Sequence, residues 1–189
     1  SGVAQRPIID IDAYEVELSS RLNPTAGSLH GIFENLRANP KRVVFAEGEE
    51  EKSIRAAYAF LNSGFGTPVL VVREKRIQDA LDRLGLPASS NIEITNSKLS
   101  PNTQTYTEMF YERMQRRGYL ERDCERLVKR DRNLFGALMV EAGDADVLVT
   151  GLTRNYHRAL QQIMHVLEVA PNLHAYGLSL VMSRGQTLF

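Results

Sequence analysis

Short apolar runs alternate with amphipathic stretches along most of this chain. From residue 41 onward the pattern predicts strands at 42–46, 68–72, 92–95 and 147–150, with strand-like segments at 174–182 and 186–189. It predicts helices at 50–63, 74–84, 102–117, 120–132, 133–142 and about 155–168. The strands are apolar on both sides, which is typical of a parallel sheet that helices cover. We therefore predict an α/β fold, a doubly wound, mainly parallel sheet with helices on both faces.

Residues 1–40 lack that alternation and predict a helical connector. Asp10 or Asp12 can cap a short helix that runs to Leu22, and Pro24 and Gly27 end it. Ser28 can then cap a second helix, which carries apolar residues at the spacing of a buried face, namely Leu29, Ile32, Phe33 and Leu36.

An acidic turn that contains a glycine joins the strand at 42–46 to its helix. Strand–turn–helix units of this kind form ligand crevices at the carboxyl ends of strands. The turn carries four carboxylates, those of Glu47, Glu49, Glu50 and Glu51. They favour a helix N-terminus but disfavour a phosphate in the same place. The chain also lacks the two glycine-rich nucleotide motifs, GxGxxG and GxxxxGK[ST], at this turn.

The charge balance gives no global attraction to nucleic acid or to an anionic membrane, because 23 basic residues match 23 acidic ones. No apolar run approaches the roughly 20 residues of a membrane span, and no leader is visible, so we expect a cytoplasmic protein. The single cysteine, Cys124, is expected to be a half-buried structural thiol. Both ends read as cut, which suggests a piece of a longer polypeptide.

The loop after the strand at 147–150 is the best candidate for a ligand site. Thr153 or Asn155 can cap the following helix, which leaves backbone N–H groups for an anion, and Arg154 suits a phosphate or carboxylate. The alternative is a plain strand-to-helix turn with a solvent-facing arginine. The candidate ligand-binding residues are Gly151, Thr153, Arg154, Asn155 and Tyr156.

A second candidate is a basic helix end flanked by aromatic residues. Three arginines, Arg113, Arg116 and Arg117, lie in sequence beside Tyr106, Phe110 and Tyr111. They could bind the phosphates of a nucleotide-like ligand, or simply form a solvated face with cations at a helix C-terminus. The four histidines show no metal-ligand spacing, and neither a nucleophile elbow nor a carboxylate pair stands out, so we predict no metal site and no catalytic residue.

Several segments resemble the phosphate acetyltransferase (phosphotransacetylase) family. They are the run 43–57, the runs 136–140 and 143–146, and Val149–Gly151. The resemblance covers residues 41–189 and implies two α/β subdomains, one over 41–144 and a truncated second one over 145–189. It also implies that the reactive serine and aspartate of the family lie beyond Phe189.

The start of the chain indicates which group of proteins the chain resembles within this family. Residues 1–8, followed by Asp12–Tyr14 and Leu18, are similar to the junction that closes the catalytic part of bacterial NADP-dependent malic enzymes. In the large members of that family, a phosphotransacetylase-like domain follows directly. Residues 1–40 are then the connector from the malic enzyme part.

Two departures separate the chain from active acetyltransferases. Alignment on the run 110–112 places Met114 where the family has an arginine, and Gln161 and Gln162 where it has an arginine followed by proline. Neutral side chains cannot supply the charge-assisted hydrogen bonds that a phosphoryl oxygen favours. Arg113 is a poor substitute for an arginine at position 114, because one residue turns about 100° around a helix.

The resemblance therefore implies a regulatory and oligomerisation domain that senses acetyl-CoA through the loop at 151–156 and has no acetyltransferase activity. The full-length enzyme would use NADP and Mg or Mn to convert malate to pyruvate, whereas this part would need no cofactor. Its partners would be acetyl-CoA, its own malic enzyme domain and further copies of itself in a dimer or higher oligomer, without nucleic acid or membrane. The alternatives are an active phosphate acetyltransferase and a purely structural assembly module.

Overall fold

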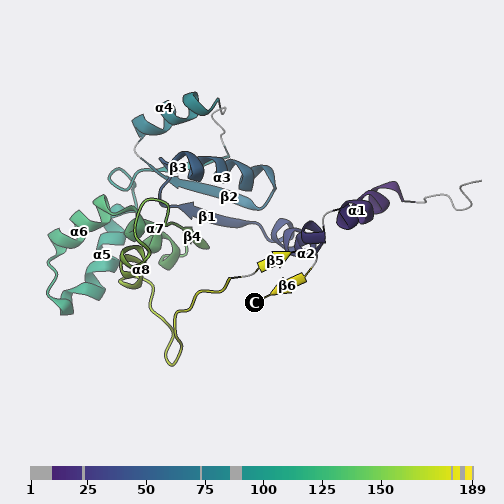
Figure 1. Cartoon of the computed structure of the whole chain (residues 1–189). Helices are drawn as coiled ribbons and strands as arrows, with labels where there is room; N and C mark the ends of the chain where they lie inside the picture. The colour runs from purple at the N-terminus through teal and green to yellow at the C-terminus, as the bar shows by residue number, and fades with distance from the viewer. Residues whose placement is uncertain are drawn as a thin grey trace, which may run out of the picture. The chain divides into compact units, whose positions relative to one another are not determined.

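The structure, a computed structural model, describes residues 10–22, 24–72, 74–85, 91–179, 181–183 and 186–188 (Figure 1). They divide into two compact units. One unit comprises Asn39–His174, and the other comprises the described residues up to Ala38 with those from Ala175 onward. The resemblance to the malic enzyme junction rests partly on residues 1–8, which lie outside the described residues.

The smaller unit contains α1 (Ile11–Leu22), α2 (Pro24–Ala38) and an antiparallel pair of strands, β5 (Val181–Ser183) and β6 (Gln186–Leu188). The predicted cap of α1 is confirmed at Asp10, whose Oδ1 accepts a hydrogen bond of 2.9 Å from the amide of Ala13. The second helix begins at Pro24, earlier than the predicted Ser28, because proline suits the first turn of a helix. The strand predicted over 174–182 is regular only from Val181.

The larger unit is built on a sheet of four parallel strands in the order β3-β2-β1-β4. The strands are β1 (Lys41–Phe45), β2 (Gly66–Val71), β3 (Glu93–Thr95) and β4 (Val147–Val149). The central strands are buried on both faces, as their continuous apolar runs predict. The predicted α/β fold with a mainly parallel sheet is thus confirmed.

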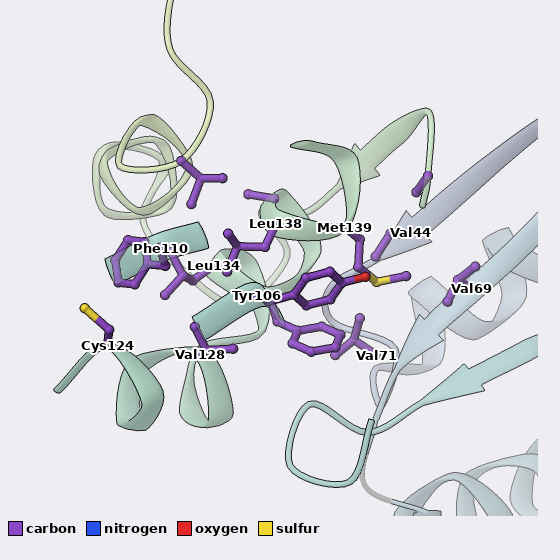
Figure 2. Packing of buried hydrophobic residues seen from close by; sticks show 14 of the residues in the cluster. Val44, Val69, Val71, Tyr106, Phe110, Cys124, Val128, Leu134, Leu138 and Met139 are labelled. Carbon is purple, nitrogen blue, oxygen red and sulfur yellow. The ribbon is translucent and has the colours of Figure 1, made fainter. Parts of the chain in front are cut away.

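Helices cover both faces of this sheet. Val43, Phe45 and Leu70 face a core that contains residues of α3 (Glu51–Asn62) and α4 (Glu74–Leu84). The alternate strand residues Val44 and Val69 face the second core, which Figure 2 shows. That core contains residues of α5 (Thr103–Met114), α6 (Glu121–Arg130) and α7 (Arg132–Glu141). Two aromatic rings pack edge to face within it, since the centroids of Tyr106 and Phe135 lie 5.3 Å apart.

In the larger unit, residues on both sides of position 145 cluster together, because β4 pairs with β1 in the same sheet and α8 (Tyr156–Met164) packs with α7. Cys124 is fully buried rather than half-buried, because it faces the core from α6. Burial, assisted by the charges of Asp123 and Glu121, raises the pKa of the Cys124 thiol. It is therefore an inert structural group.

Candidate functional site

The candidate loop and the acidic turn meet at one edge of the sheet. The turn follows β1 and the loop follows β4, and these strands are parallel neighbours with Phe45 in register with Val149. The amide of Ala46 donates a hydrogen bond of 3.0 Å to the carbonyl of Val149, so the pairing continues to the start of the turn. Parallel strands place their carboxyl ends together, which is where α/β folds bind ligands.

The Glu47 carboxylate fills the cradle of amides that the loop offers. Its Oε2 accepts hydrogen bonds from the amides of Gly151 (3.0 Å) and Leu152 (2.6 Å). Its Oε1 accepts one from the amide of Thr153 (2.8 Å) and another from the Thr153 hydroxyl. Glu47 is only 2% exposed. The amides that the sequence analysis left for a bound anion are therefore taken by a side chain of the protein itself.

These contacts keep Glu47 ionised. Burial alone would raise the pKa of its carboxyl. The hydroxyl of Thr153 and the amides of Leu152, Thr153 and Gly151 together outweigh burial and lower the pKa below its ordinary value. From the sequence, Glu47 was expected only as one of four carboxylates at a helix N-terminus, so this role was missed. One feature of the sequence could have indicated this role. Glu47 directly follows a buried strand and lies too far before the helix that starts at Glu51 to cap it.

A glycine is required in both the turn and the loop. Gly48 lies against β2, where an added Cβ would come within 2.8 Å of a Val72 methyl group and 3.0 Å of the Val71 nitrogen. Gly151 has φ of +110°, a conformation that side-chain-bearing residues rarely adopt, and its amide faces Glu47. The first glycine therefore lets the turn pack on β2, and the second gives the loop its backbone path.

Arg154 does not project freely into solvent, because a half-buried polar network holds it. Its Nη1 donates to Oδ2 of Asp131 (2.8 Å) and to Oε1 of Gln162 (3.0 Å). Gln162 in turn donates to Asp131 and accepts from Asn133, whose Oδ1 accepts a hydrogen bond from Thr150. Asp131 is also the N-cap of α7. Sequence reasoning found Arg154 but missed its partners, which come from segments distant in sequence.

The remaining loop residues divide between a structural and an exposed role. Asn155 is the N-cap of α8, because its Oδ1 accepts a hydrogen bond of 2.9 Å from the amide of His157. This confirms one of the two caps proposed from the sequence. Tyr156 is 66% exposed and packs edge-on against His157. Of the five candidate residues, Tyr156 presents the largest accessible apolar surface.

The positions of the two missing arginines differ in environment. Met114 is 1% exposed and belongs to the core against the sheet. Gln161 is exposed on α8. Arg113 turns away from the position of Met114, since its guanidinium contacts the carboxylate of Glu141 and the carbonyl of Val166. It therefore does not replace an arginine at position 114, as the helical geometry predicts.

The second candidate site does not assemble. Tyr106 and Phe110 are both 1% exposed and lie in the core, away from solvent where a ligand could stack (Figure 2). Burial, together with a hydrogen bond to Asp144, raises the pKa of Tyr106 to about 12, so its phenol stays neutral. Arg116 and Arg117 are exposed in a single 3₁₀ turn. These two arginines therefore fit the alternative given above, a solvated face with cations at a helix C-terminus.

The described residues form neither a metal-binding cluster nor a membrane span. Across the described residues, His, Cys, Asp and Glu side chains do not gather in groups of three or more that could hold an ion. Within the same residues, every helix is too short or too polar to cross a bilayer.

Among curated proteins, the chain is similar to several malic enzymes. The chain is 44% identical over 189 residues to the NADP-dependent malic enzyme of Rhizobium meliloti (strain 1021) and 31% identical over 191 residues to that of Escherichia coli (strain K12). It spans only 25% of the length of each. The phosphate acetyltransferase of Clostridium acetobutylicum is 29% identical over 145 residues, which are 77% of this chain and 43% of that protein.

Solved structures show the same fold. The EutD phosphotransacetylase of Staphylococcus aureus superposes with a TM-score of 0.78 at 24% identity, over 86% of this chain and 49% of that one. A phosphotransacetylase from Streptococcus pyogenes superposes with a TM-score of 0.68 over 78% of this chain and 45% of that one. The family of phosphate acetyl/butaryl transferases matches residues 28–189, which is most of the chain. The chain therefore belongs to the phosphate acetyl/butaryl transferase family.

Proposed function

We propose that this chain is a domain of an NADP-dependent malic enzyme, which oxidatively decarboxylates malate to pyruvate and CO2. Similarity over the full chain to a quarter of the length of such enzymes supports the assignment. NADP and Mg²⁺ or Mn²⁺ would act in other parts of that protein. The chain itself belongs to a family named for acetyl transfer, which is a different reaction from malate oxidation. The role of this domain is therefore proposed separately.

Within that enzyme, we propose that the domain senses acetyl-CoA and contributes to a homo-oligomer without transferring the acetyl group. The observation that carries this proposal is the core position of Met114, where the resemblance expects a cationic side chain in active relatives. A buried thioether offers no charge-assisted hydrogen bond to a phosphoryl oxygen. Gln161 is neutral as well. Loss of such contacts costs several kcal/mol of transition-state stabilisation, on the order of an oxyanion-site deletion.

The loop itself supports binding without phosphate chemistry. Its amides at Gly151–Thr153 hold the Glu47 carboxylate, whose charge opposes a phosphate at the same place. Arg154 is committed to Asp131. The exposed ring of Tyr156 offers an apolar surface for the neutral acyl or pantetheine part of acetyl-CoA. The ligand would regulate malate oxidation through different affinities for two states of the enzyme.

The test is the effect of acetyl-CoA on the full-length enzyme and on a Tyr156→Ser variant. We expect acetyl-CoA to change the rate of malate oxidation in the parent protein, and the variant to need severalfold more acetyl-CoA for the same change. Tyr176→Ser is the matched control, because Tyr176 is 83% exposed and lies outside the loop. An equal response of all three proteins would contradict the assignment of this loop. If acetyl-CoA gave neither a change in rate nor any heat of binding, only the role in oligomerisation would remain.

An active phosphate acetyltransferase is the second candidate function. The 29% identity to the Clostridium acetobutylicum phosphate acetyltransferase favours it. Formation of acetyl phosphate from acetyl-CoA and phosphate by the full-length protein distinguishes this candidate from a sensor.

A further inference from the structure

A small cavity lies beside the carboxyl ends of β2 and β3, separate from the loop after β4. Its volume is about 190 Å³. The residues that line it come from the end of β2, the segments that follow β1 and β3, and the junction of α6 and α7; they are Glu49, Val71, Val72, Asn96, Ser97, Lys98, Lys129, Arg130 and Arg132. The proposed acetyl-CoA loop contributes no residue to this lining.

The lining has an excess of positive charge. Lys98, Lys129, Arg130 and Arg132 surround the space, and among the described lining residues Glu49 is the sole carboxylate. Lys129 forms an ion pair with Glu125, which is outside the lining. In the described part of the chain, neither Lys98 nor Arg130 has an acidic partner within ion-pair distance. Cations held this close repel one another unless an anion lies between them.

One guanidinium nitrogen is buried without a hydrogen-bond acceptor. The Nη1 atom of Arg132 is inaccessible to solvent and donates no hydrogen bond within the described residues. Its separation from Oε2 of Glu49 is 3.5 Å, which is an ion pair but too long for a good hydrogen bond. A buried donor without an acceptor is costly and rare, so a turn of the guanidinium toward an anion in the cavity would remove that cost.

Local structure fixes Arg132 in this position. It is the first residue of α7, and Asp131 caps that helix through the amides of Asn133 (3.0 Å) and Leu134 (3.2 Å). On the opposite wall, the Ser97 hydroxyl donates a hydrogen bond of 3.0 Å to the carbonyl of Lys129, which ties the segment after β3 to the end of α6. The segments that line the cavity are therefore joined to one another in the absence of a ligand.

We propose that this cavity binds a small phosphate-bearing anion, with the Arg132 guanidinium, turned toward the cavity, as a donor and Lys98 as a second cation. The volume is below the roughly 300–1,000 Å³ of pockets for drug-sized molecules, so the cavity is too small to enclose a whole nucleotide or coenzyme. A phosphate, or a phosphoryl group on a short carbon chain, suits a space of this size. A dianion suits four cations and one carboxylate better than a monoanion does.

The test is binding of inorganic phosphate to the full-length protein, measured by isothermal titration calorimetry at constant ionic strength with chloride as the balancing anion. We expect saturable binding that Arg132→Gln weakens by at least about tenfold, which corresponds to the loss of one charge-assisted hydrogen bond. Lys98→Gln should weaken it severalfold, and this exposed position keeps the test valid if Arg132→Gln does not fold. Arg116→Gln removes the same charge from an exposed site and should bind as the parent does.

A second titration with phosphoglycolate distinguishes the two sources of the phosphoryl group. Tighter binding than inorganic phosphate identifies a small organic phosphate as the ligand class, whereas equal or weaker binding identifies free phosphate. The proposal is overturned if neither probe binds saturably at millimolar concentration. It is also overturned if both substitutions in the cavity leave the affinity unchanged. Neither result bears on acetyl-CoA, which is tested at Tyr156.

Discussion

The carboxylate of Glu47 accepts a hydrogen bond of 2.8 Å from the amide of Thr153, a residue 106 positions later in the chain. Together with the Gly151 and Leu152 amides, this contact joins the turn after β1 to the loop after β4. The carboxylate acts as an internal anion in a cradle that would otherwise suit an external one. Removal of the Glu47 carboxylate should therefore change the stability of the fold rather than the binding of a charged ligand.

Glu47→Gln should lower the free energy of unfolding by about 1–3 kcal/mol, because a neutral amide places N–H donors against backbone donors. The measurement is urea unfolding of the 189-residue chain. Glu51→Gln is the control, since its ion pair with Arg55 joins side chains that are 61% and 59% exposed. Such pairs contribute about 0.3–0.5 kcal/mol. Equal losses in the two variants would show that the cradle contributes nothing special.

The contribution of Glu47 should also depend on pH. Its pKa in the folded chain is below the ordinary 4.5, so the folded state favours the ionised form. The stabilisation is complete above that ordinary value and disappears as the pH falls through the lowered pKa. The difference in unfolding free energy between the parent and Glu47→Gln should therefore shrink below pH 4.5. A difference that grew on acidification would contradict the lowered pKa.

Met114→Ala should cost about 2–5 kcal/mol of unfolding free energy, as deletion of a buried side chain does. Met164→Ala is the matched control, because Met164 is 37% exposed and its loss leaves no enclosed cavity. Thermal or urea unfolding measures both. If Met114→Ala instead altered ligand affinity without a loss of stability, residue 114 would line a binding site and its core role would be wrong.

Arg154 and Gln162 should be energetically coupled. Substituting Arg154→Met and Gln162→Leu singly and together forms a double-mutant cycle, and contacts within one buried network give coupling energies of about 0.5–3 kcal/mol. The 3.0 Å hydrogen bond between the two side chains and their shared partner Asp131 are the reason. Simple additivity of the two substitutions would indicate that Arg154 is free to meet a ligand.

The local pattern predicted the elements well and the site only in part. The continuous apolar runs of β1 and β2 are a local signal, so the parallel sheet was predictable. The capping role of Asn155 was predictable for the same reason. The partners of Glu47 and Arg154 were not, because they depend on which strand ends are adjacent in space. The cavity around Arg132 likewise joins segments that no sequence motif connects.

Strand pairing also explains why residues on both sides of position 145, the subdomain boundary that the family resemblance implies, lie in one compact unit. Asp146 is tied to the first strand, because its Oδ2 accepts a hydrogen bond of 2.8 Å from the amide of Arg42. The residues that follow form β4, which pairs with β1. The order in which strands pair is a tertiary property, and the pattern along the chain does not specify it.

The most direct test of the sensor assignment is to supply the full-length protein with acetyl-CoA and phosphate, and to measure acetyl-CoA binding and acetyl phosphate formation on the same sample. In this domain the buried Met114 occupies the position where the family has an arginine. The domain should therefore bind the thioester with measurable heat and form no acetyl phosphate above background. Sustained formation of acetyl phosphate at the rates of a dedicated acetyltransferase would contradict the assignment.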